Sequence, residues 1–346
     1  MQKIRTATGA LMALLIARTA WAASPIPQPP VDLGATSFLD GEAGPGFLLE
    51  IIGNAYSAAL VTDAAGRPLP GNNGQSGDSL ILHTAYVSNV PVFGGHLGFE
   101  VLLPFAFIDL TVAGAPQMTQ GGAGDVTVAP FVQWSGLHLF DRDFSMRIGL
   151  QGVVPAGSYS TGRSLNIGQD VWQISPYYAF TWRTTQRWEI SGRLIYDWSS
   201  ANTSPPLVSG ALSVQPGDQF ATDLSASYAV SEHWRLGVAS YMLQQLSDSK
   251  VNDLPIPGSK QRAFALGPGA LWTDGRVTLI GNLYREFATE NRPEGFSGIV
   301  RMLCPLLMER KISKRPQRIH ACRFLASMAA RTNQFEPEGM EESWLN

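Results

Sequence analysis

The sequence predicts an all-β chain that folds as a transmembrane antiparallel β-barrel of about twelve strands, preceded by a signal peptide. Three observations support this prediction: an export signal at the N-terminus, a period-two alternation of apolar and polar residues along most of the chain, and connections that alternate between long and short. After the signal segment, no stretch approaches about eighteen consecutive apolar residues, which argues against a helical membrane protein.

The first element is the export signal. Lys3 and Arg5 precede a short apolar run, and Ala20-Trp21-Ala22 forms a cleavage pattern. This arrangement predicts a signal peptide over residues 1–22 that carries the chain through the inner membrane and is then removed. Together with the predicted barrel, it places the protein in the bacterial outer membrane.

Residues 23–45 are Pro-rich and weakly patterned. Such a segment is either a periplasmic extension or a plug that enters the barrel lumen, and the sequence leaves both interpretations open.

The strands follow from the period-two alternation. In residues 171–183 one face carries Trp172, Ile174 and further aromatic residues, while the other carries small and polar side chains. An aromatic face of this kind suits contact with lipid. Comparable segments lie at 46–60, 78–90, 95–112, 124–134, 144–154, 170–183, 187–199, 219–230, 233–246, 261–272, 276–287 and 295–307. Their number is even, as expected for a single-chain bacterial barrel over residues 46–307.

The connections give an independent indication, because outer-membrane barrels have short periplasmic turns and longer outer loops. Long polar loops are predicted at 62–77, 113–123, 156–169, 200–218 and 247–260, and tight links at 184–186, 231–232 and 273–275. A soluble β-sandwich also alternates in hydropathy, but its loops have no reason to alternate in length.

Catalytic, cofactor-binding and metal sites are not expected. His83, His96, His138 and His233 have no paired spacing such as H-E-x-x-H, and no G-x-S-x-G elbow occurs. The net charge of −3 and the lack of a basic cluster in the body of the chain argue against nucleic acid as a partner.

The alternation also predicts which side chains face the lumen. These charged and polar residues either set a transverse field that orients polar solutes or solvate the wall and pair with one another, and both interpretations stay open. The candidates are Arg147, Gln151, Gln173, Tyr177, Glu189, Arg193, Asp197, Asp223 and Arg235.

Three segments resemble the signatures of a known family. They are residues 124–131 (Gly-Asp-Val-Thr-Val-Ala-Pro-Phe), residues 155–159 (Pro-Ala-Gly-Ser-Tyr) with 166–168 (Asn-Ile-Gly), and residues 286–295 (Glu-Phe-Ala-Thr-Glu-Asn-Arg-Pro-Glu-Gly). They resemble the outer-membrane family named for the meta-pathway of phenol degradation, over roughly residues 40–303.

The resemblance implies a twelve-stranded channel through which small aromatic or hydrophobic compounds diffuse passively across the outer membrane. Its partners are then membrane lipid, the barrel assembly machinery and a small aromatic solute. Barrels that secrete functional amyloid subunits belong to the same broad superfamily, so the alternative is a secretion or structural barrel without small-molecule transport.

The chain departs from the family pattern at its end. Residues 308–346 lack strand alternation, contain almost no glycine and hold several basic residues. We hypothesise a frameshift near Met302 to Cys304 or a fused foreign tail, which would remove the terminal aromatic assembly signal; a genuine periplasmic helical tail is the alternative. The two cysteines, Cys304 and Cys322, could bridge in an oxidising periplasm, and the sequence leaves this open.

Overall fold

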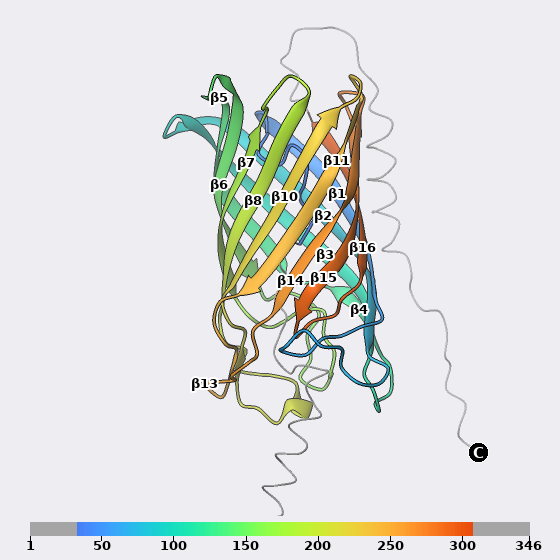
Figure 1. Ribbon diagram of the computed structural model, residues 1–346. Coiled ribbons are helices and arrows are strands. Elements are labelled where there is room, and N and C mark those ends of the chain that lie inside the picture. Colours follow the sequence, from blue (N-terminus) through green and yellow to red (C-terminus); the bar gives the residue numbers. More distant parts are fainter. Residues whose placement is uncertain (1–32, 307–346) are drawn as a thin grey trace, which may run out of the picture. The chain divides into compact units, whose positions relative to one another are not determined.

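A computed structural model describes residues 33–306, which form a closed antiparallel β-barrel (Figure 1). The signal segment, residues 308–346 and Cys322 lie outside the described residues. The wall strands are β1 (Gly46–Ala58), β2 (Gly74–Val92), β3 (Gly95–Thr111), β4 (Met118–Ala123), β5 (Val126–Leu139), β6 (Arg142–Val154), β7 (Gln173–Trp182), β8 (Trp188–Ser199), β10 (Gln219–Ala229), β11 (Trp234–Gln245), β14 (Arg262–Thr273), β15 (Thr278–Glu290) and β16 (Phe296–Leu306).

The barrel closes because β1 pairs with β16, from Phe47 opposite Leu306 to Ser57 opposite Phe296. All other wall strands pair with their neighbours along the chain. Both β4 and β5 pair with β3, one after the other along its length, so they form a single position in the wall. The thirteen strands of the sheet therefore make a barrel of twelve, and the predicted fold class is confirmed.

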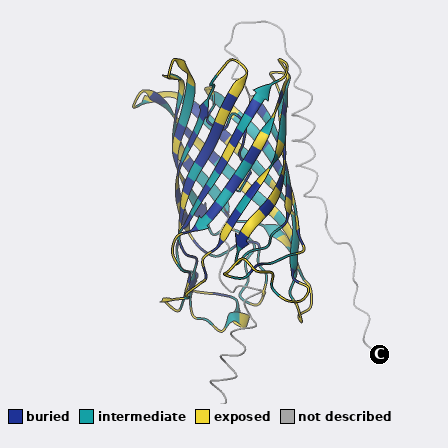
Figure 2. Ribbon diagram, viewed as in Figure 1, coloured by how far each residue is buried: buried dark blue, intermediate teal, exposed yellow. Residues whose placement is uncertain are grey.

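Alternating burial along each strand separates a lipid face from a lumen face (Figure 2). In β7 the buried positions are the polar or small ones, and the partly exposed positions carry apolar and aromatic side chains. This is the inverse of a soluble protein, because the solvent on the outside is hydrocarbon. Within the described residues no helix is long and apolar enough to span a membrane.

Connections at the two ends of the barrel differ in length. Tight turns join the strands at one end, drawn at the top of Figure 1, and the long loops gather at the other end. The long loops carry a short 3-10 helix, η2 (Leu207–Ser209), and a small sheet of β9 (Val214–Gln215), β12 (Lys250–Val251) and β13 (Leu254–Pro255).

Two predicted loops were too long. Residues 118–123 form β4 rather than part of the loop at 113–123, and β2 begins at Gly74 inside the loop predicted at 62–77. Both stretches contain two glycines and a glutamine, and glycine has a low intrinsic strand preference. They are strands because their backbone groups pair with those of β3. This pairing uses main-chain hydrogen bonds, so it does not require an alternation of apolar and polar side chains.

Candidate functional site in the barrel lumen

Residues 33–45 run through the interior of the barrel and are held by inward-facing side chains of several strands. The backbone N–H of Gly34 donates to the Asp223 carboxylate of β10 at 2.8 Å. Farther along, the N–H of Leu39 donates to the Ser191 hydroxyl of β8 at 3.1 Å. These contacts satisfy backbone groups that would otherwise be buried without partners.

Two ion pairs also hold this segment. Asp40 forms a bidentate pair with Arg193, with N–O distances of 3.0 and 3.1 Å, and both side chains are less than a tenth exposed. Glu42 forms a second bidentate pair with Arg183, which follows β7, at 2.7 and 2.8 Å. Hydrogen bonding to Glu42 raises the pKa of Arg183 above its usual value, so this pair keeps its cation throughout the accessible pH range.

Gly41 allows the segment to lie directly against the wall. Its N–H donates to the Thr181 hydroxyl at 3.0 Å, and its carbonyl accepts from the Gln133 amide at 2.8 Å. A Cβ atom at position 41 would lie 2.3 Å from the backbone of Phe180 and Thr181. Only glycine permits so close an approach of two backbones.

A chain of polar contacts crosses the inner wall from β16 to β7. Arg301 donates to Glu50 at 2.6 Å, and the other oxygen of Glu50 lies 2.6 Å from His83 Nδ1. The second ring nitrogen of His83 lies 3.2 Å from Glu100, which accepts a hydrogen bond from the Tyr177 hydroxyl at 2.9 Å. Because β7 and β3 are not neighbours in the sheet, the Tyr177–Glu100 contact spans part of the lumen.

Arginine side chains lie over aromatic rings on the same wall. The Arg193 guanidinium is 4.7 Å from the centre of the Tyr177 ring, and Arg147 is 4.7 Å from that of Phe131. The Tyr177 ring lies against Gly149, where a Cβ would sit 2.3 Å from the ring. The inner wall therefore brings arginine cations and aromatic rings into direct contact.

The structure places all nine residues predicted to face the lumen among the buried ones. Asp197 accepts from the Gln173 amide at 2.6 Å, while Glu189 and Arg235 both contact the Ser227 hydroxyl. Asp223 binds the segment described above, as does Arg193. The exposed fractions are Arg147 8%, Gln151 9%, Gln173 2%, Tyr177 3%, Glu189 0%, Arg193 6%, Asp197 2%, Asp223 3% and Arg235 8%. What these residues do for a solute stays a prediction.

Four of the inward-facing residues were not predicted from the sequence, and His83 was considered there only as a catalytic candidate. The four are Glu50, Glu100, Arg301 and Glu286. The period-two pattern places Glu50 and Glu100 on the inner faces of β1 and β3, so the signal was present. The partners were not predictable, because Arg301 is 251 residues from Glu50 and meets it only when the barrel closes. Among the described residues, no group of three or more His, Cys, Asp or Glu could hold a metal ion.

The segments that resemble family signatures make two separate sets of contacts near the long-loop end. Asp125, between β4 and β5, accepts from the N–H groups of Gly157 at 2.9 Å and Gln169 at 2.8 Å, which ties the loop after β6 to the rim. On β15, Glu286 accepts from Tyr241 at 2.8 Å and from the N–H of Gly295 at 3.0 Å. These residues hold loops and wall together, and their contacts are structural.

Comparison with known proteins supports this grouping. Residues 58–302, more than two thirds of the chain, match the profile of the family described as "Putative MetA-pathway of phenol degradation". The chain belongs to this family. The match ends at Met302, although β16 continues to Leu306. The barrel and the family together place the protein in the bacterial outer membrane, in contact with its lipid. None of the curated proteins matches.

Solved structures resemble this chain to different degrees. The COG4313 outer membrane channel from Pseudomonas putida F1 has a TM-score of 0.70 and 17% identity, covering 80% of this chain and 100% of that one. The transport unit of the autotransporter AIDA-I from Escherichia coli has a TM-score of 0.49 and 12% identity, covering 84% and 97%. A mutant of the TodX monoaromatic hydrocarbon channel has a TM-score of 0.43 and 8% identity, covering 82% and 98%. At these identities the first likeness concerns the fold, and the other two scores are too low to carry an argument.

Proposed function

We propose that the barrel is a passive channel through which small aromatic or otherwise apolar compounds cross the outer membrane. The observation that carries the proposal is the inner wall, where Arg147 and Arg193 lie over the rings of Phe131 and Tyr177. A phenol or an aromatic acid could exchange these contacts for equivalent ones of its own. Membership of a family named for phenol degradation points to the same class of solute.

In this proposal residues 33–45 act as a plug that sets the width of the path. Their polar contacts are hydrogen bonds and two ion pairs. Among their apolar side chains, Phe38 is buried in a cluster with Leu271 and Ile280, and Leu33, Leu39 and Ala43 pack against buried clusters of the wall. Polar contacts of this kind exchange with water more readily than a hydrophobic core opens. Transport then needs no nucleotide, cofactor or catalytic step, and the concentration difference drives it.

Flux through the purified barrel tests the proposal. We would reconstitute the protein in lipid vesicles and measure entry of 4-hydroxybenzoate at mildly alkaline pH, where the ionised solute crosses lipid slowly. Glucose serves as a comparison solute without a ring, and empty vesicles give the background. We expect faster entry of 4-hydroxybenzoate than of glucose. Entry of both at the background rate would contradict the channel and favour a secretion or structural barrel.

The route to the membrane is part of the same proposal. Residues 1–22 direct export, and the barrel assembly machinery inserts the chain. Residues 308–346 follow β16 in the sequence and remain, by hypothesis, a frameshifted or fused tail that weakens the assembly signal.

A further inference from the structure

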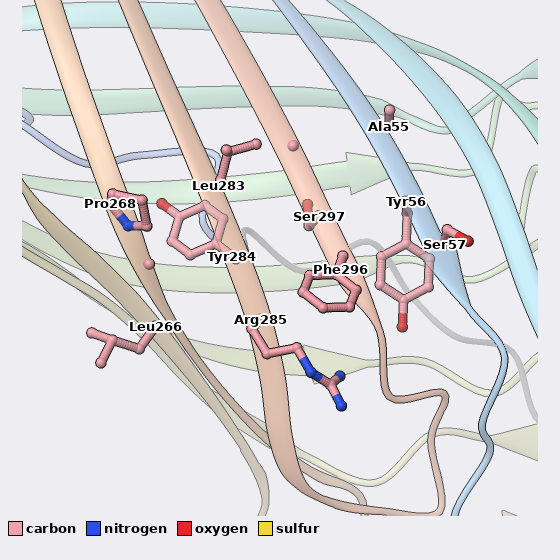
Figure 3. Close-up of a pocket in the computed structure, with 12 residues that line it drawn as sticks. Ala55, Tyr56, Ser57, Leu266, Pro268, Leu283, Tyr284, Arg285, Phe296 and Ser297 are labelled. Atoms are coloured by element: carbon pink, nitrogen blue, oxygen red, sulfur yellow. The ribbon is translucent and has the colours of Figure 1, made fainter.

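A hollow of 440 Å³ lies on the wall where β14, β15, β16 and β1 run side by side (Figure 3). Leu283 and Phe296 on its rim are among the most exposed apolar side chains of the wall, so the hollow opens toward lipid. It exists because Ala55 and Gly298, which are paired across β1 and β16, have little or no side chain. Its volume is within the range of small-molecule sites, roughly 300–1,000 Å³.

Arg285 places a cation at the edge of this apolar hollow. Its guanidinium lies 4.8 Å from the centre of the Phe296 ring, donates to the carbonyl of Gly295 at 3.1 Å and forms a longer ion pair with Glu294 at 3.4 Å. The side chain is 45% exposed, and these two hydrogen bonds use two of its five N–H donors. In Figure 3 it lies on the side of the hollow toward the β15–β16 connection, which belongs to the long-loop end.

Depth in the membrane identifies the anion that such an arginine meets. A charged side chain on the lipid face is costly at the midplane, by roughly 2–4 kcal/mol, and inexpensive near the interface. Arg285 is in register with Phe296, the first residue of β16, and therefore lies in the outer leaflet half of the wall. The phosphates of outer-leaflet lipid are the anions available at that level.

A second hollow of 510 Å³ provides a contrast. It is lined by residues of β11, β14, β15 and β16 such as Trp234, Trp272 and Gly281, and has no charged residue in its lining. These residues lie toward the tight turns, in the inner leaflet half. Of these two hollows, the one in the outer leaflet half carries a cation in its lining and the other does not.

We infer that the hollow at Arg285 binds one lipid A molecule of the outer leaflet, with an acyl chain in the hollow and a phosphate on the guanidinium. The apolar lining accepts hydrocarbon, and Arg285 is held by Phe296 in a position to make a charge-assisted hydrogen bond to phosphate. The inference rests on the outer-membrane barrel itself and is independent of which solute the lumen carries.

Binding of diphosphoryl lipid A to the delipidated, refolded barrel in detergent, measured by native mass spectrometry, tests the inference. We expect the substitutions Arg285→Gln and Gly298→Leu each to weaken binding about tenfold, the first by removing the cation and the second by filling the hollow. The matched controls are Arg276→Gln, an exposed arginine in the β14–β15 turn, and Gly281→Leu, a substitution in the uncharged hollow. Both controls should bind as the unmodified protein does.

Two further measurements use the unmodified protein and need no folded variant. Dephosphorylated lipid A should bind about tenfold more weakly than the diphosphoryl form, and inorganic phosphate at the same concentration should not compete. Equal binding with and without phosphates would overturn the role of Arg285. Full competition by inorganic phosphate would overturn the role of the hollow, as would undiminished binding to a folded Gly298→Leu variant.

Discussion

The ion pair between Asp40 and Arg193 is the strongest test of whether residues 33–45 control the lumen. The Asp40 and Arg193 side chains are 5% and 7% exposed, so replacing Asp40 by Asn removes the carboxylate that forms a bidentate pair with a buried arginine. Breaking a buried pair in this way costs roughly 3–5 kcal/mol. We expect about 3 kcal/mol, because Arg193 keeps its contact with the Tyr177 ring. That value corresponds to about a hundredfold increase in the ratio of molecules in which residues 33–45 have left the inner wall to molecules in which they are bound to it.

Single-channel recording in planar bilayers measures this shift as the frequency of high-conductance openings. The control is Asp141→Asn, in the tight turn after β5, where the side chain is exposed and the φ of 57° is one that Asn accepts. Openings as rare in Asp40→Asn as in this control would refute the reasoning that the pair seats the segment.

A second substitution is expected to release residues 33–45 from the inner wall through a steric clash. In Gly41→Ala the new Cβ would collide with the backbone of β7, at a cost of roughly 1–3 kcal/mol, and openings should again become more frequent. In the control Gly44→Ala, the Cβ meets nothing within 4 Å. If both variants open equally often, close contact at Gly41 does not hold the segment.

The remaining predictions concern stability. Tyr177→Phe removes the hydroxyl that donates to Glu100 and should lower the free energy of unfolding by roughly 1–3 kcal/mol in urea titrations of the barrel in detergent micelles. Tyr178→Phe, on the opposite face of the same strand, should change the free energy of unfolding little. An equal loss in the two variants would show that the hydrogen bond to Glu100 does not stabilise the barrel. Leu224→Arg places a charge on the lipid face near the middle of β10 and should cost roughly 2–4 kcal/mol on folding into vesicles, whereas Leu212→Arg, in a loop and 80% exposed, should cost nothing measurable. Equal folding of the two arginine variants would argue against lipid at Leu224.

The alternation of residues was enough to predict the wall. A strand has a period of two, and a barrel in lipid must place apolar side chains at every second position. The face that a residue such as Ile190 or Arg193 occupies can therefore be predicted from its immediate neighbours in the sequence. The lengths of the connections then separate the two ends. Where local preference was weak, as in the Gly- and Gln-containing β4, the pattern failed and the strand was missed.

The contacts across the lumen were decided by the tertiary structure alone. The period-two pattern predicts that Glu50 faces inward, but Glu50 meets Arg301 only because β1 pairs with β16 when the barrel closes. Glu100 likewise contacts Tyr177 of a strand that is not its neighbour in the sheet. The path of residues 33–45 is likewise absent from the sequence pattern, because an irregular segment has no period and takes its course from the side chains that satisfy its backbone. Local chemistry therefore determined which face each residue occupies, and barrel closure determined which residues meet.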